Sequence, residues 1–368
     1  MTERESLMPT FIPGLELGRL FYEEAVRPIL SDRFTGLRHS AALLGPGSEV
    51  LGYDSARSTD HSWGPRLQLF LDESDYESHG RKISEVLAGA LPREFHGYST
   101  NFSDSEADDS PLMTPIATGP VNHRVEIHTI RSFFNIALGV DPYEPISPKD
   151  WLTFSEQSLL SVTRGAVFFD GTGNLTAIRE KFDYYPRDVW LYLLASQWRR
   201  IDQEEPFVGR CAEAGDELGS QIIAARLTQD IMRLCFLMES KYAPYIKWLG
   251  TAFQELEISG ALLPILEAIL AARDGHERQK RLSLAYMRVA KAHNELGITE
   301  HIQPDVSPFH NRPYDIIHGS RFVNAIRAKI HDQDVLALTP DIGSVDQMSH
   351  STDILSNPGR RRRLRELY

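Results

Sequence analysis

The sequence predicts an α+β protein in which a mixed-sheet unit with helices precedes a mainly helical unit. Short apolar segments that end in glycine-rich turns alternate with amphipathic helical patterns through the first part of the chain. Longer helical patterns dominate residues 186–296. A chain of 368 residues is also long enough for two hydrophobic cores. We therefore expect an α/β unit over residues 10–145, a mainly helical unit over residues 146–335 and a flexible tail over residues 336–368.

The first unit contains several short segments with the composition and period of strands. The first of them is apolar and runs into Gly-Pro-Gly-Ser, and the second alternates polar and apolar residues. The expected strands cover residues 40–44, 66–71, 95–102 and 124–130. The expected helices cover residues 15–27 and 82–91. Pro28 is expected to end the first helix because proline lacks the backbone N–H that would continue it.

The second unit begins with one more mixture of helix and strand before it becomes helical. The patterns predict a helix at residues 150–162, a strand at 166–170 and a helix at 175–182. The strand ends at Gly171-Thr172-Gly173, which has the composition of a turn. Beyond it the chain is expected to form a bundle of helices.

The composition excludes several classes of protein. There are 39 basic and 51 acidic side chains, and the net charge of -12 argues against a general electrostatic attraction to nucleic acid or to an anionic membrane. Two cysteines, Cys211 and Cys235, cannot build a disulfide framework or a four-thiolate zinc site. The N-terminus lacks the apolar core of a secretory signal, and no apolar run of about 20 residues follows. We therefore expect a cytoplasmic protein with no membrane partner.

One constellation of residues predicts a site for phosphate and metal. A glycine-rich turn such as Gly47-Ser48 can present backbone N–H groups and a hydroxyl to phosphate, and carboxylates such as Asp60 and Glu126 can hold Mg²⁺. Glu126 and His128 are two residues apart in an expected strand and therefore share a face. Alone, Gly47-Ser48 is typical of an ordinary turn and Glu126 of a surface carboxylate. Their combination with Asp60 favours a binding site.

Four short sequences give this constellation a family resemblance. The sequences GSEVLGYD, STDHSWGPR, VEIHTIRSFF and YIKWLGTAF resemble the DUF4037 family, within the nucleotidyltransferase superfamily related to DNA polymerase beta. The similarity covers residues 10–335. It implies an enzyme dependent on Mg²⁺ or Mn²⁺ that transfers a nucleoside monophosphate from a nucleoside triphosphate, with ATP expected, and releases pyrophosphate. The acceptor, a small molecule or a nucleic acid, is not identified by the resemblance.

The resemblance also implies roles for individual residues. Gly47 and Ser48 would contact phosphate, and Asp60 and Glu126 would be the catalytic carboxylates that hold metal. Glu126 would also accept the proton of the attacking hydroxyl. The sequence departs from the family at Ser62. The family has a metal-binding aspartate at this position, and this chain has a neutral serine.

Ser62 leaves two functions open. A hydroxyl is a poor substitute for a carboxylate beside divalent ions. The chain can be an enzyme, with one metal and assistance from His61 or Glu49, or it can be a catalytically impaired nucleotide-binding or scaffold protein of the same fold.

The helical unit contributes further candidates for nucleotide binding. Arg226, Asp230 and Arg233 form a polar stripe on an otherwise apolar helix, which is either a ladder of ion pairs within that helix or the lining of a cleft. Lys241 and Lys247 flank a group of aromatic residues and can serve as phosphate contacts.

Two charged segments have simpler interpretations beside functional ones. The acidic segment 103–110 is expected to be a solvated linker. The arginine-rich segment 360–365 is either a salt-bridged chain end or a contact for RNA-like acceptors.

Overall fold

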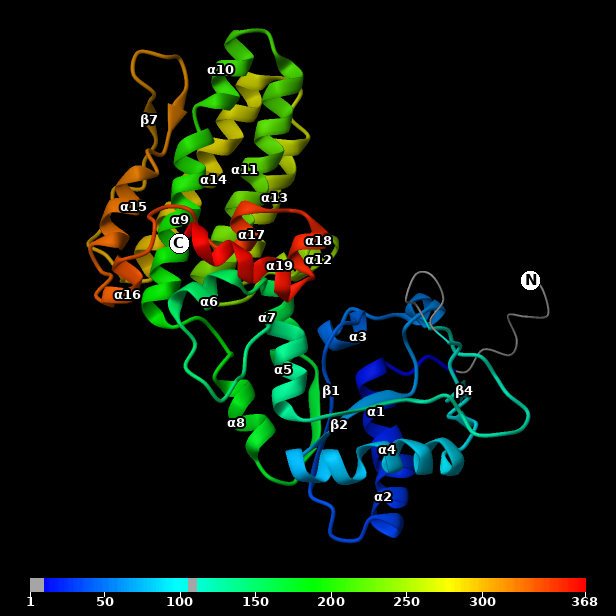
Figure 1. Ribbon diagram of the computed structural model, residues 1–368. Helices are drawn as coiled ribbons and strands as arrows, with labels where there is room; N and C mark the ends of the chain where they lie inside the picture. The colour runs from blue at the N-terminus through cyan, green and yellow to red at the C-terminus, as the bar shows by residue number, and fades with distance from the viewer. Residues whose placement is uncertain (1–9, 105–110) are drawn as a thin grey trace, which may run out of the picture. The chain divides into compact units, whose positions relative to one another are not determined.

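The structure is a computed structural model that describes residues 10–104 and 111–368 (Figure 1). Residues 105–110, most of the acidic segment, lie outside the described residues. The described chain forms two compact units. Unit 1 contains the residues up to 145 and residues 158–183, and unit 2 contains residues 146–157 and 184–368. The α+β class is confirmed, since unit 1 contains a mixed sheet and unit 2 is mainly helical.

Unit 1 is built on a four-stranded sheet in the order β5-β2-β1-β6. Its strands are β1 (His39–Leu43), β2 (Arg66–Leu71), β5 (Arg124–His128) and β6 (Ala166–Asp170). Strand β1 pairs antiparallel with β2 and β6, and β2 pairs parallel with β5. The expected boundaries assigned residues 158–183 to the second unit. In the structure these residues belong to unit 1, because β6 pairs with β1 at the edge of the sheet.

Unit 1 also contains helices, several of which pack against this sheet. They are α1 (Gly14–Phe21), the π-helical segment η1 (Tyr22–Val26), α2 (Arg27–Arg33), α3 (Ser48–Leu51), the 3₁₀ helix η2 (Ala56–Asp60), α4 (Glu73–Ala90), α5 (Ile130–Leu138), α7 (Glu156–Thr163, which begins in unit 2) and α8 (Asn174–Glu180). Pro28 does not end the first helix, contrary to expectation. It lies in the first turn of α2, after η1, where a missing backbone N–H is tolerated.

A short hairpin replaces the strand expected at residues 95–102. It pairs β3 (Glu94–Phe95) with β4 (Tyr98–Ser99). The two residues between the strands, His96 and Gly97, have φ values of 49° and 86°. Two consecutive left-handed residues are typical of a tight hairpin turn, and the turn divides the apolar segment in two.

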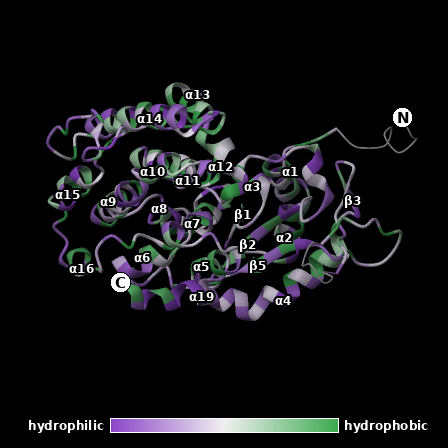
Figure 2. Ribbon diagram, turned by 90° about the horizontal axis from the view of Figure 1, so that it is seen from above, coloured by the Kyte–Doolittle hydropathy of each residue, from purple (hydrophilic) through white to green (hydrophobic). Residues whose placement is uncertain are grey.

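The sheet of unit 1 has one apolar face and one face, called the polar face below, on which polar side chains lie beside the aromatic ring of Phe70. Leu67, Leu69 and Leu71 alternate along β2 and join a buried core with residues of α1 and α4. Figure 2 shows hydrophilic and hydrophobic residues alternating along α4, which buries Ile83 and Leu87 on this core. The residues between these leucines point to the opposite face because side chains alternate along a strand. That opposite face carries the candidate site.

Unit 2 is a bundle of helices with a short hairpin. The elements are α6 (Pro148–Thr153), α9 (Arg187–Glu204), α10 (Phe207–Glu213), α11 (Glu217–Met238), α12 (Ile246–Phe253), α13 (Ser259–Leu270), α14 (Gly275–Glu295), β7 (Ser307–Pro308), β8 (Asp315–Ile316), α15 (Ser320–Arg327), α16 (Gln333–Leu336), α17 (Val345–Met348), α18 (Thr352–Leu355), α19 (Pro358–Arg362) and η3 (Arg363–Leu367). Helix α9 packs against α11 and α15, and α14 packs against α11 and α13. Trp198 of α9 stacks on Phe322 of α15 with ring centroids 4.0 Å apart.

The C-terminal segment is helical and packed, whereas residues 336–368 were expected to be a flexible tail. Helices α17, α18 and α19 are red in Figure 1, and α19 packs against α6. Arg361 is 1% exposed, and its Nε donates to the Thr153 carbonyl at 3.0 Å. The Tyr368 hydroxyl donates to the Leu152 carbonyl at 3.2 Å. The polar composition predicted a flexible tail, but these polar side chains can be buried because main-chain carbonyls of unit 2 accept their hydrogen bonds.

Among the described residues, none of the helices combines the length and the apolar composition needed to cross a membrane.

Candidate functional site

Glu126 lies on the polar face of the sheet, within a group of nitrogen donors. The parallel pairing of β2 with β5 places it opposite Gln68, whose Nε2 donates to Glu126 Oε2 at 3.4 Å. Arg124 Nη2 donates to Glu126 Oε1 at 3.3 Å, and His128 Nε2 lies 3.5 Å from Oε2. The side chain remains 40% exposed. The carboxylate is therefore held in place and is still accessible to a ligand.

These neighbours keep Glu126 ionised. Partial burial alone raises the pKa of the carboxyl group, but the contact with His128, the charges of Arg66 and Arg124 and the hydrogen bond from Gln68 lower its pKa to about 2. An ionised carboxylate can bind a cation without first losing a proton. It is poorly suited to the predicted second role of proton acceptor, because general bases work best with a pKa near the ambient pH.

The Gly47-Ser48 turn is attached to the start of β2 by a buried ion pair. Arg66 donates to Glu49 Oε1 from Nε at 2.8 Å and from Nη2 at 2.5 Å, and both side chains are 3% exposed. The same Nη2 donates to the Pro46 carbonyl at 2.7 Å. Gly47 has a φ of 145°, and an added Cβ would lie 2.5 Å from Glu49 Oε2. Only glycine fits this backbone conformation next to the ion pair.

Gln68 connects the segment before the turn with Glu126. Its Oε1 accepts a hydrogen bond from the Leu44 N–H at 2.9 Å, while its Nε2 contacts Glu126. The Gly45 N–H is bound separately, by the Ser161 carbonyl at 2.7 Å. Sequence reasoning missed Arg66 and Gln68. The available signal was their place in β2, where the polar members of an alternating pattern share one face.

Asp60 and Ser62 lie on the segment before β2. Asp60 ends η2 with a side chain that is 68% exposed, and its Oδ1 lies 2.8 Å from Nδ1 of His61. Ser62 has a φ of 51°, and its N–H donates to the Pro111 carbonyl at 2.9 Å. The contacts of Asp60 therefore involve His61, whereas those of Glu126 involve residues of β2 and β5. Within residues 10–104 and 111–368, no group of three or more His, Cys, Asp or Glu side chains is placed to hold a metal ion.

The polar stripe of α11 in unit 2 forms ion pairs with other helices. Arg226 Nη2 donates to Glu204 Oε1 at 2.5 Å, and Arg200 Nε donates to Asp230 Oδ1 at 2.9 Å. Both partners belong to α9, so these contacts are not a ladder within α11. Arg226 is still largely exposed, and it remains available to an anion at the surface of unit 2.

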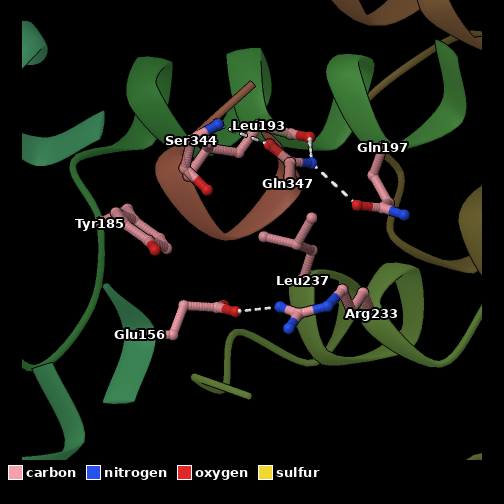
Figure 3. A pocket seen from close by; sticks show the side chains of 8 residues that line it. All are labelled: Glu156, Tyr185, Leu193, Gln197, Arg233, Leu237, Ser344 and Gln347. Carbon is pink, nitrogen blue, oxygen red and sulfur yellow. Dashed lines mark hydrogen bonds and ion pairs between the residues drawn. The ribbon is translucent and has the colours of Figure 1, made fainter. Parts of the chain in front are cut away.

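Arg233, the third member of the stripe, borders a small cavity (Figure 3). Its Nη1 donates to Glu156 Oε2 at 2.9 Å. Burial and the nearby charge of Asp346 raise the pKa of Glu156, and Arg233 opposes them. The cavity is lined by Glu156, Tyr185, Leu193, Gln197, Arg233, Leu237, Ser344 and Gln347. Its volume of about 10 Å³ is that of a single water molecule, which excludes it as a nucleotide site.

The two candidate lysines of unit 2 are exposed and have local partners. Lys241 Nζ donates to Glu239 Oε2 at 3.1 Å. Lys247 Nζ lies 5.0 Å from the centre of the Trp248 ring, a cation–π geometry. Each is held at the surface of unit 2 by these contacts.

Comparison with known proteins gives one family match. The family model for the domain of unknown function DUF4037 matches residues 151–249. The resemblance to the DUF4037 family is therefore confirmed over this segment. The DUF4037 segment contains Arg226, Lys241 and Lys247, and it does not extend to Gly47 or Glu126. Support for the site on the sheet therefore comes from the residues of unit 1 and not from the family match.

Two further comparisons add little. No curated protein matches the chain. The crystal structure of a nucleotidyltransferase-like protein from Exiguobacterium sibiricum 255-15 is similar over 83% of this chain and 89% of its own, with 9% sequence identity and a TM-score of 0.32. At that TM-score the likeness is weak, and it indicates neither a substrate nor a mechanism.

Proposed function

We propose that the protein is a Mg²⁺-dependent nucleotidyltransferase that transfers a nucleoside monophosphate from a nucleoside triphosphate, with ATP as the expected donor. One observation supports this proposal most strongly. The glycine turn at Gly47-Ser48 and the ionised Glu126 are both attached to β2, through Arg66 and Gln68. A turn that could hold phosphate and a carboxylate that could hold a metal, both attached to one strand, would suit such a transfer.

In this proposal Glu126 and Asp60 would be the carboxylate ligands of one Mg²⁺ ion. Mg²⁺ is commonly bound by one or two carboxylates, with water and substrate phosphates as the other ligands. Glu126 is ionised and accessible, and Asp60 is exposed. A bound Mg²⁺ would offset the charge of the triphosphate and polarise its phosphorus–oxygen bonds.

The residues of the chain would then have separate tasks. Gly47 and Ser48 would hold the phosphates, and Glu126 and Asp60 would hold the metal. The other predicted phosphate contacts, Arg226, Lys241 and Lys247, are exposed cations of unit 2. The acceptor would be a small molecule or a nucleic acid.

A second function is a nucleotide-binding or scaffold protein without catalysis. Two observations favour it. Ser62 provides no negative charge, and the guanidinium groups of Arg66 and Arg124 already offset the charge of Glu126. Both features would weaken the attraction of the site for divalent ions.

Pyrophosphate release from ATP in the presence of Mg²⁺ or Mn²⁺ tests the first function. Glu126→Gln is expected to lower the rate by about 100-fold or more, because it removes the charge that holds the metal. Glu77→Gln is the matched control on α4, where the side chain is exposed. Equal rates for the parent and Glu126→Gln would refute the assigned role. Absence of ATP binding by the parent protein would refute the transferase and would leave only a scaffold role for the second function.

Ser62→Asp separates the two functions. The left-handed backbone at position 62 tolerates aspartate, so the variant should fold. A gain of pyrophosphate release over an inactive parent, by about tenfold or more, would show that the parent is an impaired nucleotide-binding protein. Equal activity of parent and variant would show that the carboxylate is dispensable and that the chain is an enzyme as it stands.

A further inference from the structure

Arg66 and Gln68 are buried polar residues that none of the roles above explains. They are two residues apart on β2, so both point to the polar face of the sheet. Arg66 is 3% exposed and Gln68 is 2% exposed. A buried ion pair such as Arg66 with Glu49 seldom adds net stability over apolar packing, because both charges lose their hydration. Their burial on the face that carries Glu126 therefore points to a role in geometry.

The two side chains bind both parts of the predicted site. Arg66 donates from Nε and Nη2 to the Glu49 carboxylate, and the same Nη2 also donates to the Pro46 carbonyl, so its partners lie on either side of Gly47. Arginine can do this because its donors form a rigid planar fork. Gln68 uses its oxygen for the Leu44 N–H and its nitrogen for Glu126. Together they connect residues before and after the turn to the strand that contacts Glu126.

We propose that Arg66 and Gln68 are positioning residues, which set the location of the Gly47-Ser48 turn relative to Glu126. Their relevance to catalysis rests on the proposed function. Neither side chain needs to touch the substrate. Arg66 acts through Glu49 and the Pro46 carbonyl, and Gln68 acts through its two hydrogen bonds.

Hydrogen exchange of the free protein tests the positioning role without any ligand. Arg66→Lys keeps the charge but loses the fork, so amide exchange in residues 44–51 should become faster by about tenfold or more. The matched control is Arg81→Lys, since Arg81 is 93% exposed on α4. Unchanged exchange in residues 44–51 would overturn the proposal. If Arg66→Lys does not fold, Glu49→Gln provides the same test, because it keeps the size and the acceptor oxygen of the partner.

Binding and turnover of MgATP then test the connection to the site. Gln68→Glu keeps the acceptor for Leu44 but removes the donor to Glu126, so it should change pyrophosphate release while exchange at Leu44 stays as in the parent. Arg66→Lys should raise the KM for ATP by about tenfold. If Arg66→Lys alters the exchange and the parent binds no ATP, the positioning of the turn is supported and the proposed function is refuted. Normal ATP kinetics in both variants would overturn the connection to the site.

Discussion

Glu205 is expected to make unit 2 less stable as the pH rises. Its side chain is completely buried, at 0% exposure. It accepts hydrogen bonds from the N–H groups of Ile317 at 2.8 Å and Gly319 at 3.1 Å. Burial raises the pKa of Glu205 to about 8, and nearby Asp202 acts in the same direction, although the backbone donors oppose both. The carboxyl group is therefore protonated in the folded protein at neutral pH.

The size and sign of the effect follow from this pKa. The pKa of Glu205 is 4.5 in the unfolded chain and about 8 in the folded protein, a difference of about 3.5 units. Each unit corresponds to about 1.4 kcal/mol, so the free energy of unfolding changes by about 5 kcal/mol in all. Below the lower value both states hold the proton, and the stabilisation is complete. Between the two values only the folded state holds it, so the free energy of unfolding falls as the pH rises. Above about pH 8 the decline ends.

Urea unfolding followed by tryptophan fluorescence measures this effect. Parent and Glu205→Gln are compared at about pH 5, 7 and 9. The glutamine variant has no titrating group at position 205, so the difference in free energy of unfolding between the two proteins isolates the contribution of Glu205. We expect that difference to shift by several kcal/mol in favour of the variant as the pH rises. Glu300→Gln, at an exposed position of unit 2, should show no such shift. A shift for Glu205→Gln below about 1 kcal/mol would refute the reasoning.

Three further substitutions test individual contacts. Gly47→Ala should lower the free energy of unfolding by about 1–3 kcal/mol in thermal unfolding, because the new Cβ meets the ion pair at a positive φ. The control Gly89→Ala should cause no loss, because its Cβ meets nothing within 4 Å. Arg233→Leu should lower the free energy of unfolding by about 1–3 kcal/mol in urea unfolding, because it removes a donor to the buried Glu156. A neutral result would show that Glu156 is held by its other contacts. Arg361→Ala should make the C-terminal segment sensitive to limited proteolysis, and unchanged cleavage would show that other contacts hold the segment.

Local patterns were sufficient for several elements of the fold. Strands β2 and β6 have the bounds that alternation and flanking turns predicted, at residues 66–71 and 166–170. The shared face of Glu126 and His128 follows from the period of a strand and appears as their 3.5 Å contact. Prediction was less successful at Pro28, because a π-helical segment comes before it and the local pattern of residues does not indicate such a segment.

The sequence by itself determined the α+β class, the glycine turn at Gly47 and the place of Glu126 on a strand, because each depends on neighbouring residues and on period. Only the tertiary structure decided that Glu126 contacts Gln68, while Asp60 contacts His61. It also decided that Arg66 binds the turn. Such pairings join residues up to 58 positions apart, and they form only where the packing of the whole unit brings their strands together.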